Sequence, residues 1–385
     1  MSPMMSVSRR LAPFGVTVFT EMTQLALEHD AINLGQGFPN WDGAEFVKEA
    51  AARSMSEGGN DQYPPSPGIP LLREAIARRY SELFHRELDP DNEITVTCGC
   101  TEALAASFLG LLEPGDEIVI IEPYYDAYPV NAALVGAIPR PVSLRAPDFA
   151  IDRDELAAAF NSKTRAIVVN NPHNPTGRVF TTDELQWVAD LCLEYDAIAI
   201  CDEVYEEMTF SDEHRRLATL DGMWDRTLTL SSLGKTFSLT GWKLGWGIGP
   251  AGLSAGLRAA HQFLTFTTPT PVQHGAVAAM GAPLAFYEEM REQYRAKRDL
   301  LASGLESAGF RPYLPQGTYF MMAGHPDAID DRRFCRELVE RAGVATIPPS
   351  VFYTRPEQGA GLVRFAFCKD EAILEQAIER LRAVS

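Results

Sequence analysis

The sequence lacks the features of several protein classes. Its 385 residues include six lysines, and the 34 basic residues are outnumbered by 52 acidic ones, for a net charge of −18. No basic block or tail is present, so a nucleic-acid partner is not expected. Every apolar stretch is interrupted by glycine, proline or charge well short of a membrane span, so a membrane partner is not expected either. We interpret the acidic excess as a solubility property.

The cysteine pattern argues against a metal centre. None of the six cysteines forms a C-x-x-C pair, and Cys98-Gly99-Cys100 is too tightly spaced for a zinc knuckle. A large apolar chain with few cysteines is typical of a reducing compartment. Arg9 and Arg10 are followed by no apolar run, so a secretory signal is not expected. The sequence therefore favours a cytoplasmic protein without a metal.

Short apolar runs alternate with helical patterns through most of the chain. The runs are β-branched and apolar on both faces, as expected for parallel strands covered by helices. They lie at residues 93–97, 117–122, 166–171, 197–202 and 227–232. Helical patterns lie at residues 70–84, 101–112 and 183–195. This alternation predicts an α/β fold with a mainly parallel sheet.

The C-terminal quarter has a different pattern. A long helical pattern at residues 286–308 precedes short strands at 318–323 and 362–368, and a last helix starts at Asp370. We interpret this region as a small α+β domain, onto which the N-terminal segment folds back. A chain of this length suits two domains. We place the large domain at residues 46–285, and the small domain with its N-terminal arm at residues 1–45 and 286–385.

The end of the first predicted strand has the features of an anion site. The glycine turn Cys98-Gly99-Cys100 leads into a helix at Thr101. The free N–H groups at a helix start bind phosphate well, and ligands of parallel sheets bind beyond the carboxyl ends of the strands. A plain turn that binds nothing is the alternative.

Two further strand ends present polar residues. Asn174 is held between Pro172 and Pro175, whose rings restrict the backbone. Asp202 ends an apolar strand, where an unpaired carboxylate would be costly, so we expect a cationic or donor partner. Tyr205 lies on the same side if the chain turns helically. The alternatives are an ordinary turn at Asn174 and a helix N-cap at Asp202.

Lys235 follows the strand at residues 227–232, and Lys243 lies in the same apolar region. A buried lysine loses its proton readily and becomes a nucleophile, whereas a solvated strand end is the ordinary alternative. Gly234-Lys235-Thr236 also resembles the end of a P-loop. Position 229 is threonine, however, so the first glycine of that motif is missing and we discount it.

Arg364, near the C-terminus, shares one strand face with the small residues Ala366 and Cys368. A planar guanidinium on such a face suits the bidentate capture of a carboxylate. A surface arginine on an edge strand is the alternative.

Together these groups meet the needs of pyridoxal 5′-phosphate (PLP). Its aldehyde bonds to a lysine, and its ring nitrogen needs an anionic partner to stay protonated. An ion pair at ~4 Å and an effective dielectric of ~20 contributes ~4 kcal/mol, or about three pKa units. Asp202 can supply this interaction, and a neutral asparagine cannot.

Segments along nearly the whole chain add to this interpretation. They are residues 33–39 (NLGQGFP), 61–63 (DQY), 101–104 (TEAL), 170–177 (NNPHNPTG), 202–205 (DEVY), 232–235 (SLGK), 240–243 (TGWK), 317–320 (GTYF) and 363–369 (VRFAFCK). With them the sequence resembles fold-type I PLP-dependent aminotransferases of class I/II. It is most similar to the subgroup of kynurenine aminotransferase, glutamine transaminase K and bacterial methionine aminotransferase. The resemblance implies an aspartate-aminotransferase-like fold, with a mainly parallel seven-stranded sheet between helices and a small α+β domain.

The resemblance also implies catalytic and cofactor-binding roles. Lys235 would form a Schiff base with PLP and then act as general base and acid. Asp202 would pair with the ring nitrogen, and Tyr205 and Asn174 would bond the 3-oxygen. Tyr125 would stack on the ring. The phosphate would be held by the backbone of Cys100 and Thr101, by Ser232 and Lys243, and by Tyr63 from the neighbouring subunit, which makes the active unit a homodimer.

For the substrate, the resemblance implies that Arg364, Asn174 and the Gly37 backbone hold the carboxylate. Phe19 and the neighbouring subunit's copy of Phe266 would line the side-chain pocket.

Three positions depart from the family pattern. Cys100 stands where alanine or glycine is usual, and Asp61 stands where asparagine is frequent. Thr267 replaces a pocket histidine of some relatives, which leaves the side-chain preference open.

We expect an aminotransferase that passes the α-amino group of methionine, glutamine, phenylalanine or kynurenine to a 2-oxo acid by ping-pong kinetics. One alternative is a cysteine-S-conjugate β-lyase on the same site. Another is an N-succinyldiaminopimelate aminotransferase, although its anionic substrate would need a further cation. A DNA-binding regulator is disfavoured, because the recognisable chain starts near Phe14 and the net charge is unfavourable.

Overall fold

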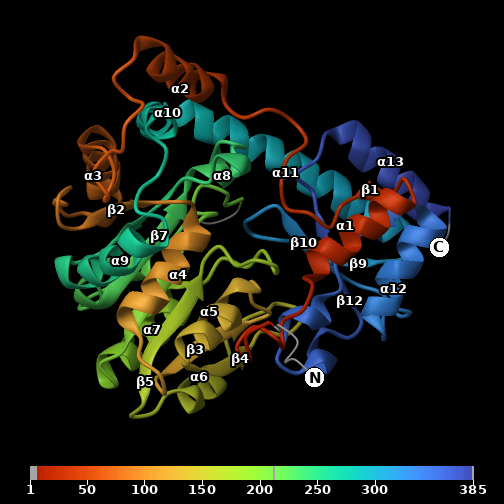
Figure 1. Ribbon diagram of the computed structural model, residues 1–385. Helices are drawn as coiled ribbons and strands as arrows, with labels where there is room; N and C mark the ends of the chain where they lie inside the picture. Colours follow the sequence, from red (N-terminus) through yellow and green to blue (C-terminus); the bar gives the residue numbers. More distant parts are fainter. Residues whose placement is uncertain (1–6, 211–212, 384–385) are drawn as a thin grey trace, which may run out of the picture.

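The computed structural model describes residues 7–210 and 213–383, and a seven-stranded sheet forms its centre (Figure 1). In spatial order the strands are β2 (Ile94–Thr97), β8 (Gly245–Ile248), β7 (Thr227–Ser232), β6 (Ile198–Asp202), β5 (Thr164–Asn170), β3 (Glu117–Glu122) and β4 (Ile138–Ser143). Strand β8 runs antiparallel to both neighbours, and the other pairs are parallel. The predicted α/β fold with a mainly parallel sheet is confirmed.

Helices cover both faces of this sheet. They are α2 (Glu45–Glu57), α3 (Pro70–Phe84), α4 (Cys100–Leu111), α5 (Ala127–Val135), α6 (Arg153–Ala159), α7 (Thr182–Glu194), α8 (Leu233–Thr236), α9 (Ala251–Leu264) and α10 (Thr270–Met280). Val168 and Ile200 pack on the face of α4, α5 and α9. Ile167 and Ala199 pack on the opposite face with α6 and α7. Burial of alternate residues on both faces explains why these strands are continuously apolar.

A second layer joins the two ends of the chain. A three-stranded antiparallel sheet contains β12 (Leu362–Ala366), β10 (Phe320–Gly324) and β9 (Arg311–Tyr313). It packs with α11 (Leu284–Ser307), α12 (Asp331–Glu337) and α13 (Glu371–Arg382). Helix α1 (Val18–Glu28) and strand β1 (Ile32–Asn33) lie among these C-terminal elements, where β1 pairs with β11 (Val344–Ala345) (Figure 1). The N-terminal segment folds back as expected.

Two strands of the central sheet were not among the expected ones, β4 and β8. Strand β4 contains Pro139 and Pro141 and lies at the sheet edge, where a missing N–H does not break a ladder. Strand β8 contains Gly245 and Gly247. A Cβ at Gly245 would lie 2.7 Å from the backbone nitrogen of Cys100, so no larger residue fits there. A prediction based on apolar runs therefore misses both strands, because proline and glycine interrupt their apolar pattern.

Helices α4 and α9 approach each other through two glycines. A Cβ added to Gly110 would lie 2.0 Å from the carbonyl oxygen of Gly256, and one added to Gly256 would lie 2.8 Å from the carbonyl oxygen of Gly110. Both neighbours are backbone atoms, which cannot move aside as a flexible side chain can. The close packing of these helices therefore depends on the missing side chains. No helix in the described ranges is long and apolar enough to cross a membrane.

We expect Gly110→Ala to lower the free energy of unfolding by about 1–3 kcal/mol, because the helices must separate to admit the methyl group. Gly252→Ala is the matched control on α9, since a Cβ there meets nothing within 4 Å. It should leave stability unchanged or raise it by up to about 1 kcal/mol. Urea unfolding followed by circular dichroism measures both. Equal midpoints for the two variants would contradict the packing argument.

Candidate active site

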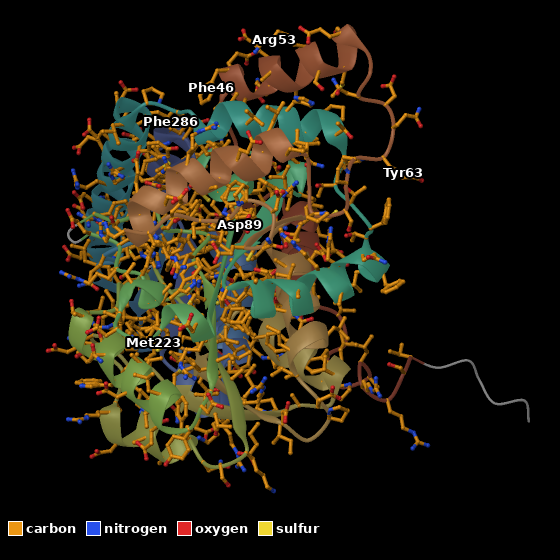
Figure 2. The ribbon with its side chains drawn as sticks, turned by 90° about the vertical axis from the view of Figure 1, so that its left-hand side faces the viewer. Phe46, Arg53, Tyr63, Asp89, Met223 and Phe286 are labelled. Atoms are coloured by element: carbon orange, nitrogen blue, oxygen red, sulfur yellow. The ribbon has the colours of Figure 1, made fainter. Side chains whose placement is uncertain are left out.

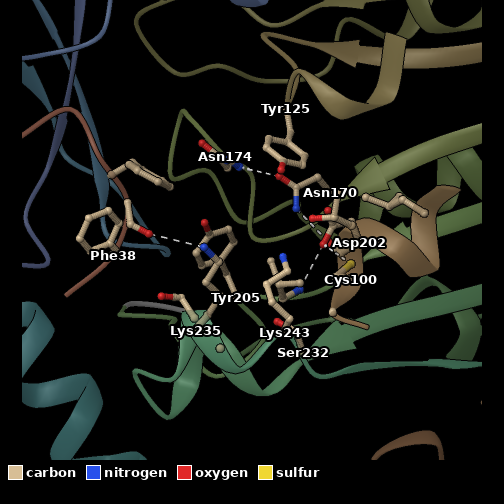
Figure 3. A pocket seen from close by; sticks show the side chains of 18 of the residues that line it. Phe38, Cys100, Tyr125, Asn170, Asn174, Asp202, Tyr205, Ser232, Lys235 and Lys243 are labelled. Carbon is tan, nitrogen blue, oxygen red and sulfur yellow. Dashed lines mark hydrogen bonds between the residues drawn. The ribbon is translucent and has the colours of Figure 1, made fainter. Parts of the chain in front are cut away.

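A cavity of about 320 Å³ lies at the carboxyl ends of the central strands, between the sheet and strand β12 (Figure 3). The sequence prediction named residues scattered over the whole chain, and the structure gathers nearly all of them here. The cavity lining includes Phe19, Gly37, Cys100, Thr101, Tyr125, Asn174, Asp202, Tyr205, Ser232, Lys235, Lys243 and Arg364.

The N-terminus of α4 forms one end of the cavity. Its N-cap residue Gly99 has φ +80°, and no side chain caps the helix. The ammonium group of Lys243 lies against this turn, since a Cβ at Gly99 would be 3.4 Å from Nζ. Ser232 ends strand β7 in the same wall. An uncapped helix start with a lysine beside it suits a phosphate group.

Lys235 lies in the short helix α8, directly after strand β7. Its Nζ is 3.5 Å from the carbonyl oxygen of Gly37, and the rings of Tyr205 and Tyr319 are each 5.7 Å away. Burial lowers the pKa of Lys235 below its ordinary value, although the nearby Asp202 carboxylate opposes the shift. A lysine with a lowered pKa supplies the neutral amine that attacks a carbonyl carbon.

Asp202 ends strand β6 with a buried carboxylate. The hydroxyl of Tyr128 donates to Oδ2 at 2.7 Å, and the thiol of Cys100 donates to Oδ1 at 3.6 Å. Burial raises the pKa of Asp202, and the hydrogen bond from Tyr128 is the largest effect that opposes it. The expected donor partner is therefore present. The thiol of Cys100, unusual for the resembled family, acts as a second and weaker donor.

Asn170, the last residue of β5, links two of the predicted residues. Its amide donates to the backbone oxygen of Asp202 at 2.9 Å, and its Oδ1 accepts from the backbone nitrogen of Asn174 at 2.7 Å. Asn174 in turn accepts from Arg364 at 3.3 Å through its own Oδ1. The strand end, the proline-bounded turn and strand β12 are thus connected in one chain of hydrogen bonds.

Arg364 is almost completely buried, so the surface alternative is wrong. Its Nη2 donates to the carbonyl oxygen of Gly35 at 2.6 Å, and the rings of Phe320 and Phe19 lie 4.3 and 5.1 Å from the guanidinium carbon. Its Nε is buried without a hydrogen-bond partner. Burial lowers the pKa of Arg364 to about 10, so the group remains charged at neutral pH. A buried cation with a free donor suits a carboxylate ligand.

Tyr63 and Phe266 do not line the cavity. Their rings pack edge to face at 5.4 Å, and their exposed fractions are 84% and 45%. Figure 2 shows Tyr63 projecting from an outlying part of the chain. These two predicted site residues therefore form an aromatic pair that is exposed to solvent, and we call it the exposed aromatic pair.

Besides Gly99, which belongs to the predicted anion turn, the cavity is lined by residues to which the sequence prediction gave no individual role. They are Gln36, Phe38, Leu104, Tyr128, Asn170, Val204, Gly234, Thr240, Leu244 and Phe320. Tyr128 is the most informative, because it belongs to helix α5 and meets Asp202 only through folding. The sequence prediction placed Asn170 inside the strand at residues 166–171 and gave it no separate role. A polar residue at the end of an apolar strand could have indicated that Asn170 belongs to the site.

Comparison with known proteins agrees with this geometry. Residues 29–381 match the model of the family described as aminotransferase class I and II. The chain belongs to this family. The aminotransferase is 40% identical to kynurenine–oxoglutarate transaminase of Dictyostelium discoideum, over 97% of this chain and 95% of the relative. It is 38% identical to methionine aminotransferase of Escherichia coli, over 97% of both chains.

Solved structures of other aminotransferases are also similar to this chain. N-succinyldiaminopimelate aminotransferase of Mycobacterium tuberculosis superposes with a TM-score of 0.95 at 43% identity, over 99% of this chain and 100% of the other. A Thermus thermophilus aspartate aminotransferase variant gives 0.91 at 31% identity, over 99% and 100%. The aspartate-aminotransferase-like fold is thereby confirmed, and so is the expected family.

Replacing Asp202 should stabilise the ligand-free chain. An acid whose pKa is raised by folding destabilises the folded state above that pKa, and has no such effect below its ordinary value of 3.8. We therefore expect Asp202→Asn to unfold at a higher urea concentration than wild type at pH 7. The difference should narrow as the pH falls towards 4. Asp221→Asn, an exposed control, should show no such shift. A lower midpoint for Asp202→Asn at pH 7 would contradict the expectation.

Proposed function

We propose that this aminotransferase uses PLP, bound in the cavity at the carboxyl ends of β5, β6 and β7. The residues fit the group: an uncapped helix start with Lys243 suits its phosphate, the buried Asp202 its ring nitrogen, and Lys235 its aldehyde. The observation that carries the proposal is that Lys235 and Asp202 line one cavity, close enough for the carboxylate to affect the pKa of the lysine.

When bound, PLP would supply an electron sink for the substrate α-carbon. Asp202 would keep the ring nitrogen protonated, and Tyr128 would hold the carboxylate in its ionised form through the 2.7 Å hydrogen bond. Tyr125, which lines the same cavity, would cover the ring face. Tyr205 keeps its proton, because burial raises its pKa. It would therefore donate a hydrogen bond to the 3-oxygen, together with Asn174.

Lys235 would act as the general base and acid that removes a proton from the substrate α-carbon and returns it. Its lowered pKa favours the neutral amine that this role requires. Arg364, with an unpartnered Nε, would hold the α-carboxylate together with Asn174 and the Gly37 backbone. Phe19 lies beside Arg364 and would contact the substrate side chain.

The proposed donor is an amino acid with a neutral, aromatic or sulfur-containing side chain: methionine, glutamine, phenylalanine or kynurenine. Among the described residues that line the cavity, the cations are Lys235, Lys243 and Arg364, and each already has a proposed partner. None remains for a second carboxylate. The acceptor would be a 2-oxo acid in a ping-pong reaction. The similarity to relatives named for kynurenine and methionine supports this choice.

Two other substrates are candidates for the same site. The similarity to a Mycobacterium tuberculosis N-succinyldiaminopimelate aminotransferase, at 43% identity, makes that substrate the second candidate. A cysteine S-conjugate would undergo β-elimination on the same site, because transfer of the substrate α-proton to Lys235 also permits departure of a good leaving group, as a thiolate, from the β-carbon. Pyruvate and ammonia released without an amino acceptor identify that reaction.

A screen of amino acids against the PLP-loaded protein tests the proposed function. Methionine, glutamine, phenylalanine and kynurenine should each change the near-visible absorbance, and a 2-oxo acid should restore it. N-succinyldiaminopimelate should act with a lower kcat/KM than the best of these. Protein that takes up no PLP, or takes it up without responding to any amino acid, would contradict the proposal.

Lys235→Ala should lower kcat by at least ~10³-fold, because the general base and acid is lost. Lys163→Ala is the matched control, since Lys163 is exposed and precedes β5, at the end of that strand opposite the cavity residue Asn170. Steady-state assays of both variants with the best donor measure the effect. Turnover of Lys235→Ala at the wild-type rate would exclude the assigned role.

We also propose a cytoplasmic homodimer with a large domain at residues 46–285 and a small domain formed by residues 1–45 and 286–385. The exposed pair Tyr63 and Phe266 supports the dimer, because an aromatic pair of this exposure is typical of an interface. In the dimer, Tyr63 would reach the phosphate and Phe266 the substrate pocket of the neighbouring subunit. The six free cysteines support a reducing compartment.

Mixing two impaired variants tests whether Tyr63 acts between subunits. Tyr63→Ala and Lys235→Ala should each be weakly active at limiting PLP. After unfolding and refolding together in equal amounts, half of the dimers are hybrids with one intact site, so activity should recover to about a quarter of wild type. Each variant refolded alone is the control. Absence of recovery in a mixture shown to contain hybrid dimers would contradict the proposed arrangement.

A further inference from the structure

Residues 35–38 form one wall of the cavity, and we call this segment the strap. Gln36, Gly37 and Phe38 line the cavity directly. The centre of the strap packs closely against Phe320 and leaves no space for a side chain, since a Cβ at Gly37 would lie 2.4 Å from that ring. Its position therefore fixes the shape of the cavity on the side of Arg364.

Side chains from other parts of the chain hold the four consecutive carbonyl groups of the strap. Arg364 donates to the oxygen of Gly35 at 2.6 Å, and the thiol of Cys368 lies 3.9 Å from that of residue 36. Tyr319 donates to the oxygen of Gly37 at 2.5 Å, and Lys235 lies 3.5 Å from the same atom. Lys369 donates to the oxygen of residue 38 at 2.7 Å. The strap is thus anchored residue by residue.

Lys369 is an unusual anchor, because it is a buried lysine whose hydrogen bond goes to a neutral carbonyl group. Its ammonium also lies 4.7 Å from the ring of Phe38. Loss of hydration is costly for an ammonium group, and it lowers the pKa of Lys369. The proposed reaction gives this residue no role. The burial of this cation beside the strap therefore requires a role outside the proton transfer and substrate contacts of the proposed reaction.

Two of the five anchoring side chains have competing roles. If the proposed function holds, Arg364 binds the substrate carboxylate and Lys235 takes part in the chemistry, so both are drawn away from the carbonyl groups of Gly35 and Gly37. The thiol of Cys368 is a weak donor. Tyr319 and Lys369 are then the strong donors that remain, and within the described ranges Lys369 supplies the side-chain donor to the carbonyl group of Phe38.

We propose that Lys369 is a positioning residue that keeps the strap closed against the cavity, so that the Gly37 backbone can meet the substrate carboxylate. This inference rests on the proposed function. All substrates share the α-carboxylate, so Lys369 affects the binding of amino donors and 2-oxo acids alike, whatever their side chains. It acts on binding, and it leaves the proton transfer by Lys235 unaffected.

The test replaces Lys369 with methionine, which keeps the length of the side chain and removes the donor. Loss of a charged hydrogen bond of this kind corresponds to roughly a 10–100-fold effect on an equilibrium. In PLP-loaded Lys369→Met, we expect KM for methionine, for phenylalanine and for a 2-oxo acid to rise by the same factor, about 10–100-fold, with kcat within about threefold. PLP affinity and absorbance should match wild type.

A second readout does not depend on activity. In the cofactor-free chain, hydrogen–deuterium exchange of a peptide covering residues 33–39 should be about tenfold faster in Lys369→Met than in wild type. Lys297→Met is the matched control, because Lys297 is also a buried lysine on an aromatic ring, 3.7 Å from Trp41, and no hydrogen bond joins it to the strap. Its exchange over residues 33–39 and its KM values should stay near wild type.

The outcomes separate the inference from the proposed function. Wild-type protein that neither binds PLP nor transfers an amino group overturns the proposed function. An active wild type with unchanged KM and exchange in Lys369→Met overturns the inference alone. A KM increase that is confined to substrates of one side-chain class also overturns the inference. An equal KM increase in Lys297→Met does the same, since either result would place the effect outside the strap.

Discussion

Asp202 ends strand β6 with its carboxylate away from water, and much of the cavity is arranged around that charge. Tyr128 and Cys100 each donate to one carboxylate oxygen, and Asn170 holds the backbone of the same residue. Burial still raises the pKa of the carboxyl group. A cation at this position, such as the protonated ring nitrogen of the proposed cofactor, would favour the ionised carboxylate.

The cations of the cavity show the complementary pattern. The chain contains 52 acidic residues, yet Lys235 and Arg364 are hydrogen-bonded to backbone carbonyl groups and an amide oxygen. Neutral partners hold these side chains in place. Under the proposed function, a carboxylate substrate would replace a carbonyl group at Arg364 and would not have to displace an acid hydrogen-bonded to it. The strap would provide the carbonyl groups that are released, and Lys369 and Tyr319 would keep it in place.

The sequence was sufficient to predict the parallel sheet, because its strands are apolar on both faces, and most of the cavity, because parallel strands bring their carboxyl ends together. It could not reveal Tyr128, whose contact with Asp202 joins a helix to a strand distant along the chain. It also missed strands β4 and β8, in which proline and glycine serve an edge and a close backbone approach. The roles of Tyr63 and Phe266 stay predictions, since they concern a second copy of the chain.

The glycine contact between α4 and α9 has a mechanical consequence. Helix α4 begins at the turn around Gly99, and α9 ends two residues before Phe266 of the exposed aromatic pair. Gly110 and Gly256 bring the two helices into close backbone contact near the opposite end of α4. Movement of one helix at this contact requires movement of the other, because the backbone atoms leave no space between them. Phe266 and the turn at Gly99 are thus attached to two helices whose relative position is set by the contact between two glycines.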